Sequence, residues 1–410
     1  MKHSVFTGIL LLFCAILHGQ ITASQLLASA WDDPTVQLHR EQQAYLEGHS
    51  FKLPLLRQIQ LQTESRDWDP VQQEYTLRFN TNSPGMMQTQ ASIAAAMRSL
   101  SQIERQALVH KALEARYDLL IDAHFAKLDQ ALMLEQQKTL QDRQAVLKEQ
   151  LLLGLEDRLN DFFRAEEDAL SIERKLFGNQ ADFKEFEQQV AVFTGNADSL
   201  AMDSFPSISQ LLAIAATSVS TEPPSVAKEQ VQSELAALKA EMQERENRNY
   251  FNFLQFKYSG NAKDELPNRF LLGAGFRFPW MSTSKLRQQE KELQALEAKA
   301  DAAEESLRNS RSTLAKLREL ARLVQLFNFT QDQRSSFVEQ YEPKRLHATG
   351  LDNPETLLRV KLSINRLDAE LFSIMKDVYK SYLSLLSETG LLTAEPARNY
   401  LSPGLDLISR

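Results

Sequence analysis

Hydrophobic positions return every seven residues along much of the stretch 281–349, which contains no glycine and a single proline, Pro343. The repeating positions are Leu286, Leu293, Ala300, Leu307, Leu314 and Ala321. A second stretch, 85–153, has no proline and no glycine after its first residue. A strict seven-residue repeat is typical of supercoiled helices. Each stretch spans 69 residues, so we predict two rod-like helices of about 100 Å at about 1.5 Å per residue.

Four short segments alternate apolar and polar residues instead. They cover residues 58–64, 74–79, 254–259 and 269–278. A period of two predicts strands with one apolar and one polar face. The residues that we expect on the apolar face are Leu61, Tyr75, Leu77, Phe79, Leu254, Phe256, Tyr258, Leu272 and Phe276.

The apolar face of these strands has two interpretations. It packs on the protein's own helices, or it meets lipid while the polar face lines water, as in an outer-membrane barrel. We expect the long helices to bury their apolar stripes against each other, and Trp68 and Trp280 lie at opposite ends of the strands, which suits membrane interfaces. Lipid contact is therefore favoured. Because four strands cannot close a barrel and lipid forbids an open edge, such a chain must oligomerise.

The chain contains signs of an internal repeat. The segment SQLLA occurs at 24–28 and again at 209–213. Helix-breaking residues recur at similar distances, since Pro84 and Pro279, Gly154 and Gly350, and Gly195 and Gly390 are each 195 or 196 residues apart. We therefore predict two structural repeats, 24–205 and 206–391, each with a helix, two strands and a long helical hairpin. Residues 392–410 form a C-terminal tail. Gly178-Asn179 is a candidate break in the first returning helix.

The N-terminus resembles a secretory signal. Lys2 precedes an apolar run of 13 residues from Val5 to Leu17, which is shorter than the ~20 residues of a membrane-spanning helix. We predict a signal peptide over residues 1–23 with cleavage near Ala23. Cys14, the only cysteine, would leave with the signal, because the bulky Phe13 is unsuited to a lipidation site.

Sequence motifs for catalysis or cofactor binding are missing. The seven histidines are scattered, and no two have the spacing of metal ligands. Phosphate-binding loops and nucleophile elbows do not occur. The net charge of −8 gives no reason to expect nucleic-acid binding. We expect no enzyme activity, no metal and no cofactor.

Several of these features together resemble the TolC family of outer membrane factors. The resemblance rests on the opening SQLLASAWDDPTVQ, Leu53-Pro54 before the first strand, the prolines at the strand exits, LGLED and TGLDN at the predicted hairpin tips, and the closing glycines. Each motif is weak alone, but their order and spacing occur twice. The match covers residues 24–390.

This resemblance implies a mainly α protein with a small β part. Three chains would each give four strands to one 12-stranded transmembrane β-barrel in the outer membrane, and their coiled-coil hairpins would form a periplasmic α-barrel. Such a homotrimer exports small molecules, metal ions or proteins together with an inner-membrane pump and a periplasmic adaptor protein. The alternative is a soluble periplasmic coiled-coil adaptor or scaffold protein, with the strands as a small packed domain.

The resemblance also implies roles for particular residues. Pro84 and Pro279 would mark the transition from barrel to helices. The hairpin tips would form the periplasmic entrance and contact the adaptor. The tip residues are Gly154, Leu155, Glu156 and Asp157 in the first hairpin and Gly350, Leu351, Asp352, Asn353 and Glu355 in the second. The alternative interpretation is purely structural: the glycines form the turns, and the acidic residues begin the next helices, where the helix dipole favours negative charge.

The second tip departs from part of the family pattern. Some relatives narrow the entrance with a ring of aspartates, but Thr356 and Arg359 stand at the corresponding positions. Asp352 and Glu355 are the nearest acids and are candidate substitutes. Pro343, which lies seven residues before Gly350, should kink or end the long helix.

Overall fold

The computed structural model describes residues 20–65, 73–195, 199–201, 204–217, 223–260, 269–276, 284–348 and 353–409. Residues 1–19 of the predicted signal, Trp68, Trp280, Pro279, Gly350, Leu351 and Asp352 lie outside these ranges. The chain divides into two compact units. Unit 1 comprises Met1–Val36, Leu108–Pro223 and Ser310–Arg410, and unit 2 comprises Gln37–Ala107 and Pro224–Asn309. Each unit therefore contains segments from both predicted repeats.

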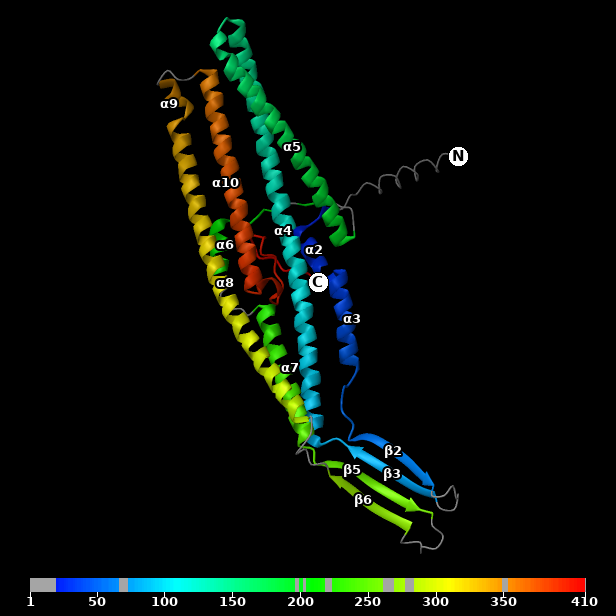
Figure 1. Cartoon of the computed structure of the whole chain (residues 1–410). Helices are drawn as coiled ribbons and strands as arrows, with labels where there is room; N and C mark the ends of the chain where they lie inside the picture. The colour runs from blue at the N-terminus through cyan, green and yellow to red at the C-terminus, as the bar shows by residue number, and fades with distance from the viewer. Residues whose placement is uncertain are drawn as a thin grey trace, which may run out of the picture. The chain divides into compact units, whose positions relative to one another are not determined.

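The longer helices and the strands follow the same order in the two halves of the chain (Figure 1). The first half contains β1 (Gln20–Ile21), α2 (Ala23–Ala28), η2 (Ser29–Asp32), α3 (Pro34–Gly48), β2 (Leu56–Ser65), β3 (Gln73–Thr81), α4 (Pro84–Leu152), η4 (Glu156–Arg158) and α5 (Leu159–Thr194). The second half contains β4 (Ser199–Leu200), α6 (Ile208–Thr217), α7 (Pro224–Asn247), β5 (Phe251–Ser259), β6 (Phe270–Phe276), α8 (Ser284–Gln340), α9 (Pro343–Ala348), α10 (Pro354–Glu388) and η7 (Leu391–Thr393). The mainly α fold with four principal strands is confirmed.

The predicted long helices are present, with one interruption. Helix α4 runs unbroken for 69 residues, whereas α8 ends at Gln340 after 57 residues. Pro343 begins the short helix α9, because proline lacks the N–H that would continue the helix but suits the first helical position. Gly178-Asn179 does not break α5. The buried Asn179 side chain donates to the Ala126 carbonyl of α4 at 3.0 Å, which ties α5 to its partner.

Unit 1 is built from packed helices. Helix α10 lies beside both α4 and α8, and α5 covers another side of α4 (Figure 1). The core includes fully buried Leu113 and Tyr117 of α4 and Val378 and Tyr382 of α10. The C-terminal tail joins this core, since the Tyr117 hydroxyl donates to the Arg398 carbonyl at 3.0 Å. In the described part of the chain, no helix combines the length and the apolar character needed to cross a membrane.

Residues just before the predicted cleavage point belong to the core of unit 1. Ile21 is buried, and its carbonyl accepts a hydrogen bond from the Ala201 N–H at 2.8 Å where β1 pairs with β4. Thr22 caps α2, because its hydroxyl accepts from the Gln25 N–H at 3.2 Å and its own N–H donates to the Gln25 side chain at 2.9 Å. Such reciprocal caps stabilise helix starts. Residues 20–23 are thus structural.

We expect the exported protein to retain Gln20 to Ala23. Cleavage after Ala23 would remove the cap and the Ile21 contacts, and it would place a new ammonium group at the positive end of α2. N-terminal sequencing and intact mass of protein purified from membranes should locate the first residue at or before Gln20. A first residue at Ser24 or Gln25 would contradict this expectation.

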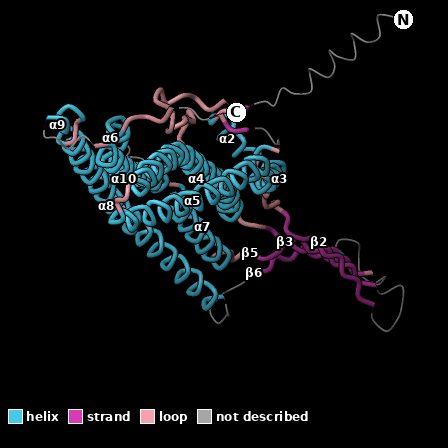
Figure 2. Tube along the Cα trace, turned by 90° about the horizontal axis from the view of Figure 1, so that it is seen from above, coloured by secondary structure: helices cyan, strands magenta, loops and turns pink. Residues whose placement is uncertain are grey.

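Unit 2 contains the four-stranded sheet and the adjoining parts of the long helices. Helices α4 and α7 pack through Ile93, Ala96 and Leu235. Arg98 of α4 donates to the Leu46 carbonyl of α3 at 3.1 Å and so satisfies part of that helix's C-terminal end. The strands lie side by side in one layer (Figure 2).

The heptad positions of α8 lie on the surface, contrary to the expectation that they pack within the chain. Leu286, Leu293, Leu307 and Leu314 are all more than half exposed. The seven-residue repeat therefore predicted the helix correctly but not its partner, since a heptad pattern does not say which helix covers it. Val324, farther along α8, is buried.

Candidate functional site

The four strands form an antiparallel sheet in the order β2-β3-β5-β6. Pairing places Leu61, Leu77, Phe256 and Leu272 in one row across all four strands. The neighbouring rows on the same face contain Phe79 and Leu254, and Tyr75 and Tyr258. Phe276 continues this face along β6. The register thus brings all nine residues predicted for the apolar face to one side.

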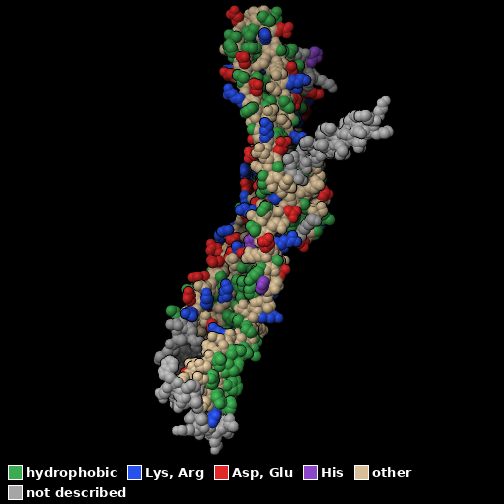
Figure 3. Space-filling model, turned by 90° about the vertical axis from the view of Figure 1, so that its right-hand side faces the viewer, with side chains coloured by type: hydrophobic (Ala, Val, Ile, Leu, Met, Phe, Trp, Pro, Cys, Tyr) green, Lys and Arg blue, Asp and Glu red, His purple; other side chains and the backbone are tan. Residues whose placement is uncertain are grey.

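The apolar face is open to its surroundings. Leu61 is 69% exposed and Leu272 65%, and Tyr75, Phe256 and Phe276 are also exposed. Leu77, Phe79, Leu254 and Tyr258 are half-buried against their neighbours in the sheet. Figure 3 shows hydrophobic side chains gathered over the strands. Exposed apolar patches of this kind mark surfaces that contact a partner or a membrane.

The opposite face is mainly polar, although Phe253 and the exposed Leu271 also lie on it. Its rows carry Gln58, Gln60 and Gln62 of β2, Thr76, Arg78 and Asn80 of β3, and Gln255 and Lys257 of β5. Lys257 forms an ion pair with Glu74 on the adjacent strand. The sheet is therefore amphipathic, with one face suited to apolar surroundings and the other to water.

Both edges of the sheet are unpaired within the described residues. Strand β2 pairs only with β3, and β6 pairs only with β5. Free edges present rows of backbone donors and acceptors that readily join another strand. Because adjacent strands alternate in direction, β2 and β6 run in opposite directions. The two edges of separate copies could thus join as antiparallel neighbours.

The first strand pair connects to its long helix through a compact turn. Pro84 stands at the first position of α4, and the Ser83 hydroxyl accepts a hydrogen bond from the Met86 N–H at 3.3 Å. The buried Asn82 donates from its side chain to the Pro54 carbonyl at 2.8 Å. Pro84 therefore lies where the sequence placed it, between strand and helix, and the Asn82 contact ties the turn to Leu53-Pro54.

The tip of the first hairpin is a glycine-terminated helix end. Gly154 has φ +86°, a conformation that strongly favours glycine. The Gly154 N–H donates to the Leu151 carbonyl at 3.0 Å, and the Leu155 N–H donates to the Gln150 carbonyl at 3.2 Å. These two bonds form a Schellman motif, which satisfies the last carbonyls of α4.

The same tip exposes an apolar patch of which the sequence interpretation included only Leu155. Leu152 is 81% exposed and Leu153 77%, and Leu155 and Leu159 are also exposed. Glu156 and Asp157 are exposed beside them. The sequence signal that could have indicated this patch is the gathering of four leucines around the turn at Gly154.

At the second tip the structure describes the chain from Asn353 onward. The Asn353 side chain accepts a hydrogen bond from the Thr356 N–H at 2.7 Å and caps α10. Glu355, in contrast, is only 4% exposed. It is not a free surface acid in this structure, so the suggestion that it substitutes for an entrance aspartate is not supported.

Glu355 belongs to a charge cluster that joins the two hairpins. One carboxylate oxygen lies 3.2 Å from Arg158 Nη1, and the other lies 2.5 Å from Arg359 Nη2. Asp161 pairs with the same two arginines, at 3.3 Å and 3.0 Å. The residues come from η4 and α5 on one side and α10 on the other. Arg359 thus has an ion-pair partner in each hairpin.

The cluster changes the acidity of its members. Burial alone would raise the pKa of Asp161, but Arg359, Arg158 and Arg143 lower it below the ordinary 3.8. A carboxyl whose pKa is lowered in the folded state stabilises that state at pH values above its ordinary pKa. This contribution is therefore present at neutral pH and is lost only under strongly acidic conditions. Burial, and then the charge of Arg359, lowers the pKa of Arg143.

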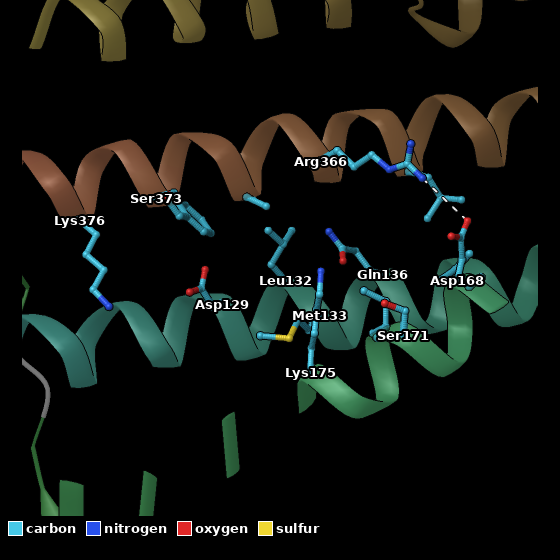
Figure 4. A pocket seen from close by; sticks show the side chains of 15 residues that line it. Asp129, Leu132, Met133, Gln136, Asp168, Ser171, Lys175, Arg366, Ser373 and Lys376 are labelled. Carbon is cyan, nitrogen blue, oxygen red and sulfur yellow. Dashed lines mark ion pairs between the residues drawn. The ribbon is translucent and has the colours of Figure 1, made fainter. Parts of the chain in front are cut away.

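A cavity of about 520 Å³ lies between α4, α5 and α10 in unit 1 (Figure 4). Leu132 and Met133 form part of its apolar surface, while Arg366 and Asp168 pair at 3.8 Å. The lining residues of each helix recur at helical spacing. Among the described residues, no three His, Cys, Asp or Glu side chains gather closely enough to hold a metal ion.

Solved structures of outer-membrane proteins share this fold. The chain aligns with CusC, studied for its transmembrane channel formation, with a TM-score of 0.64 and 12% identity over 90% of this chain and 92% of that chain. The Campylobacter jejuni outer membrane channel CmeC gives a TM-score of 0.62 and 11% identity over 90% and 85% of the two chains. The Vibrio cholerae outer membrane protein VceC gives a TM-score of 0.58 and 15% identity over 90% of this chain and 96% of that chain.

Comparisons of the sequence with protein-family models and with curated proteins found no match. At identities of 11 to 15%, the structural likeness concerns the fold. The solved structures confirm the fold that the TolC-family resemblance implied, with long helical hairpins and a four-stranded sheet in one chain.

Proposed function

We propose that three copies of this chain form an outer-membrane channel that serves as an export conduit without chemistry of its own. The observation that carries the proposal is the sheet, whose apolar face is exposed and whose two edges are unpaired within the described residues. Water does not suit such a face, and lipid does not tolerate such edges. Both conditions are met when several sheets join in a closed ring within a membrane.

The strand directions support this closure. Strand β6 of one copy can pair with β2 of the next and keep every neighbouring pair antiparallel. Head-to-tail contacts of this kind generate rings when the rotation closes. The TolC-family resemblance supplies the number three and hence twelve strands, with Leu61 and the other apolar-face residues toward lipid and the polar face toward the lumen.

Contacts between copies would also cover the exposed stripe on α8. Leu286, Leu293 and Leu307 follow a heptad spacing that fits a helix of a neighbouring chain. In this proposal the helices continue the channel into the periplasm. The stripe then packs between chains and not within one chain.

The helical tips are proposed to face the periplasm and to receive cargo from an inner-membrane pump through an adaptor protein. The exposed leucines at Leu152, Leu153, Leu155 and Leu159 offer an apolar contact surface. Gly154, Glu156, Asp157 and Asn353 lie at these tips in the described residues. Glu355 and Arg359 would hold the two hairpins together there.

Membrane fractionation and electrical recording test the proposal together. We expect the protein to stay in the outer-membrane fraction after a carbonate wash, to require detergent for extraction, and to migrate as a trimer that conducts ions in planar bilayers. Release by carbonate as a soluble protein would favour the alternative of a periplasmic coiled-coil adaptor or scaffold. A membrane-bound trimer without current at any voltage would contradict the conduit.

A further inference from the structure

Arg78 occupies an unusual position on the polar face of the sheet. Its Nη2 donates to the Gln255 side chain at 3.3 Å, and its guanidinium carbon lies 4.1 Å from the centre of the Phe253 ring. The Nε atom is buried and has no hydrogen-bond partner among the described residues. A cation over an aromatic face is held by the ring's negative charge density. The side chain is therefore held in a defined place.

A glycine on the neighbouring strand makes room for this arrangement. On the neighbouring strand β6, Gly275 pairs with Phe253 and Gly273 pairs with Gln255. A Cβ atom added to Gly275 would lie 2.2 Å from Phe253 Cε1, which is far closer than carbon atoms approach each other. The glycine thus lets the Phe253 ring lie flat on the polar face, where it supports Arg78.

The charge of Arg78 is not balanced at its own level of the sheet. Its row contains Gln60, Gln255 and Gly273, which carry no charge. Lys257 is paired with Glu74. Glu64 lies four residues beyond Gln60 on β2, or about 14 Å at about 3.4 Å per residue. That separation exceeds the Debye length of about 8 Å at physiological salt.

We propose that Arg78 gives the lumen of the strand region a preference for anions. This inference rests on the proposed function, because it requires that the polar face line a water-filled pore. Rotational symmetry places the equivalent residue of every copy at the same height, so the trimer carries a ring of three Arg78 side chains. Rings of arginine favour anions in the same way that rings of carboxylates favour cations.

Bilayer recordings in a KCl gradient test the proposal. We expect the reversal potential of the wild-type trimer to lie toward the chloride equilibrium potential at an ionic strength of about 0.15 M, where the Debye length of about 8 Å keeps the more distant Glu64 from offsetting Arg78. Arg78→Lys should keep this preference because it keeps the charge. Arg78→Gln should move the reversal potential toward zero, and Arg78→Glu should move it past zero.

A second variant acts in the opposite direction. Glu74→Gln leaves Lys257 without its carboxylate partner one row from Arg78, so the anion preference should increase. This variant keeps the proposal testable if substitutions of Arg78 prevent assembly. If the wild-type trimer conducts and neither Arg78→Gln nor Glu74→Gln changes the reversal potential, the anion preference of Arg78 is overturned but the channel is not. Absence of current in the wild type would overturn the channel as well.

Discussion

Replacing Leu61 with arginine is expected to abolish stable assembly in the outer membrane. Leu61 belongs to the central row of the sheet and is 69% exposed on the apolar face. An arginine on the lipid face near the middle of the bilayer costs roughly 2–4 kcal/mol per chain, or about 6–12 kcal/mol for three copies. This is comparable to the whole stability of many proteins, about 5–15 kcal/mol. The measurement is the amount of detergent-extracted trimer relative to wild type.

The matched control is Gln62→Arg on the same strand. Gln62 pairs with Thr76 on the polar face, so the same arginine should be tolerated in a water-filled lumen and the trimer should form at wild-type levels. Equal yields for both variants would contradict a lipid-facing apolar side. Equal loss in both would indicate that β2 tolerates arginine on neither face. The comparison would then give no support for one lipid-facing and one water-facing side.

Replacing Glu355 with glutamine is expected to loosen the joint between the two hairpins. The substitution keeps the size of the side chain but removes the charge that pairs with Arg158 and Arg359. Loss of one partner costs about 3–5 kcal/mol for fully buried pairs and about 0.2–1 kcal/mol for exposed pairs. The two arginine side chains are 37% and 48% exposed, so we expect about 1–3 kcal/mol.

Hydrogen exchange gives the direct measurement. Amides of η4 and of the first turns of α10 should exchange about tenfold faster for each 1.4 kcal/mol lost. In a bilayer the single-channel conductance should also rise, because the tips would separate more readily. Glu370→Gln is the control, since Glu370 is an exposed acid on the same helix. Unchanged exchange in the Glu355 variant would show that the ion pairs do not hold the hairpins together.

The elements that depend on local physics were predictable from the sequence. Gly154, Gly195 and Gly390 end helices with positive φ as expected, because few other residues adopt that conformation without strain. Pro84 and Pro343 both begin helices. The four alternating segments are strands, and their apolar residues share a face, since side chains alternate along every strand.

Contacts between distant segments were not predictable in the same way. Arg158 and Asp161 meet Glu355 and Arg359 across nearly two hundred residues of chain, and nothing in local spacing brings them together. Gly178-Asn179 looked like a break because of its residue types. Burial of Asn179 and its hydrogen bond to Ala126 keep α5 continuous instead.

The long helices, the amphipathic strands and the positions of the turns follow from local sequence alone, because helix breakers, period-two alternation and backbone conformational limits act over a few residues. The tertiary structure decided which apolar surfaces remain uncovered: the stripe on α8 is exposed and Glu355 is buried. It also placed Ile21 and Ala23 in the core of unit 1. Burial and ion pairing depend on which segments meet in space, and periodicity along the chain carries no information about that choice.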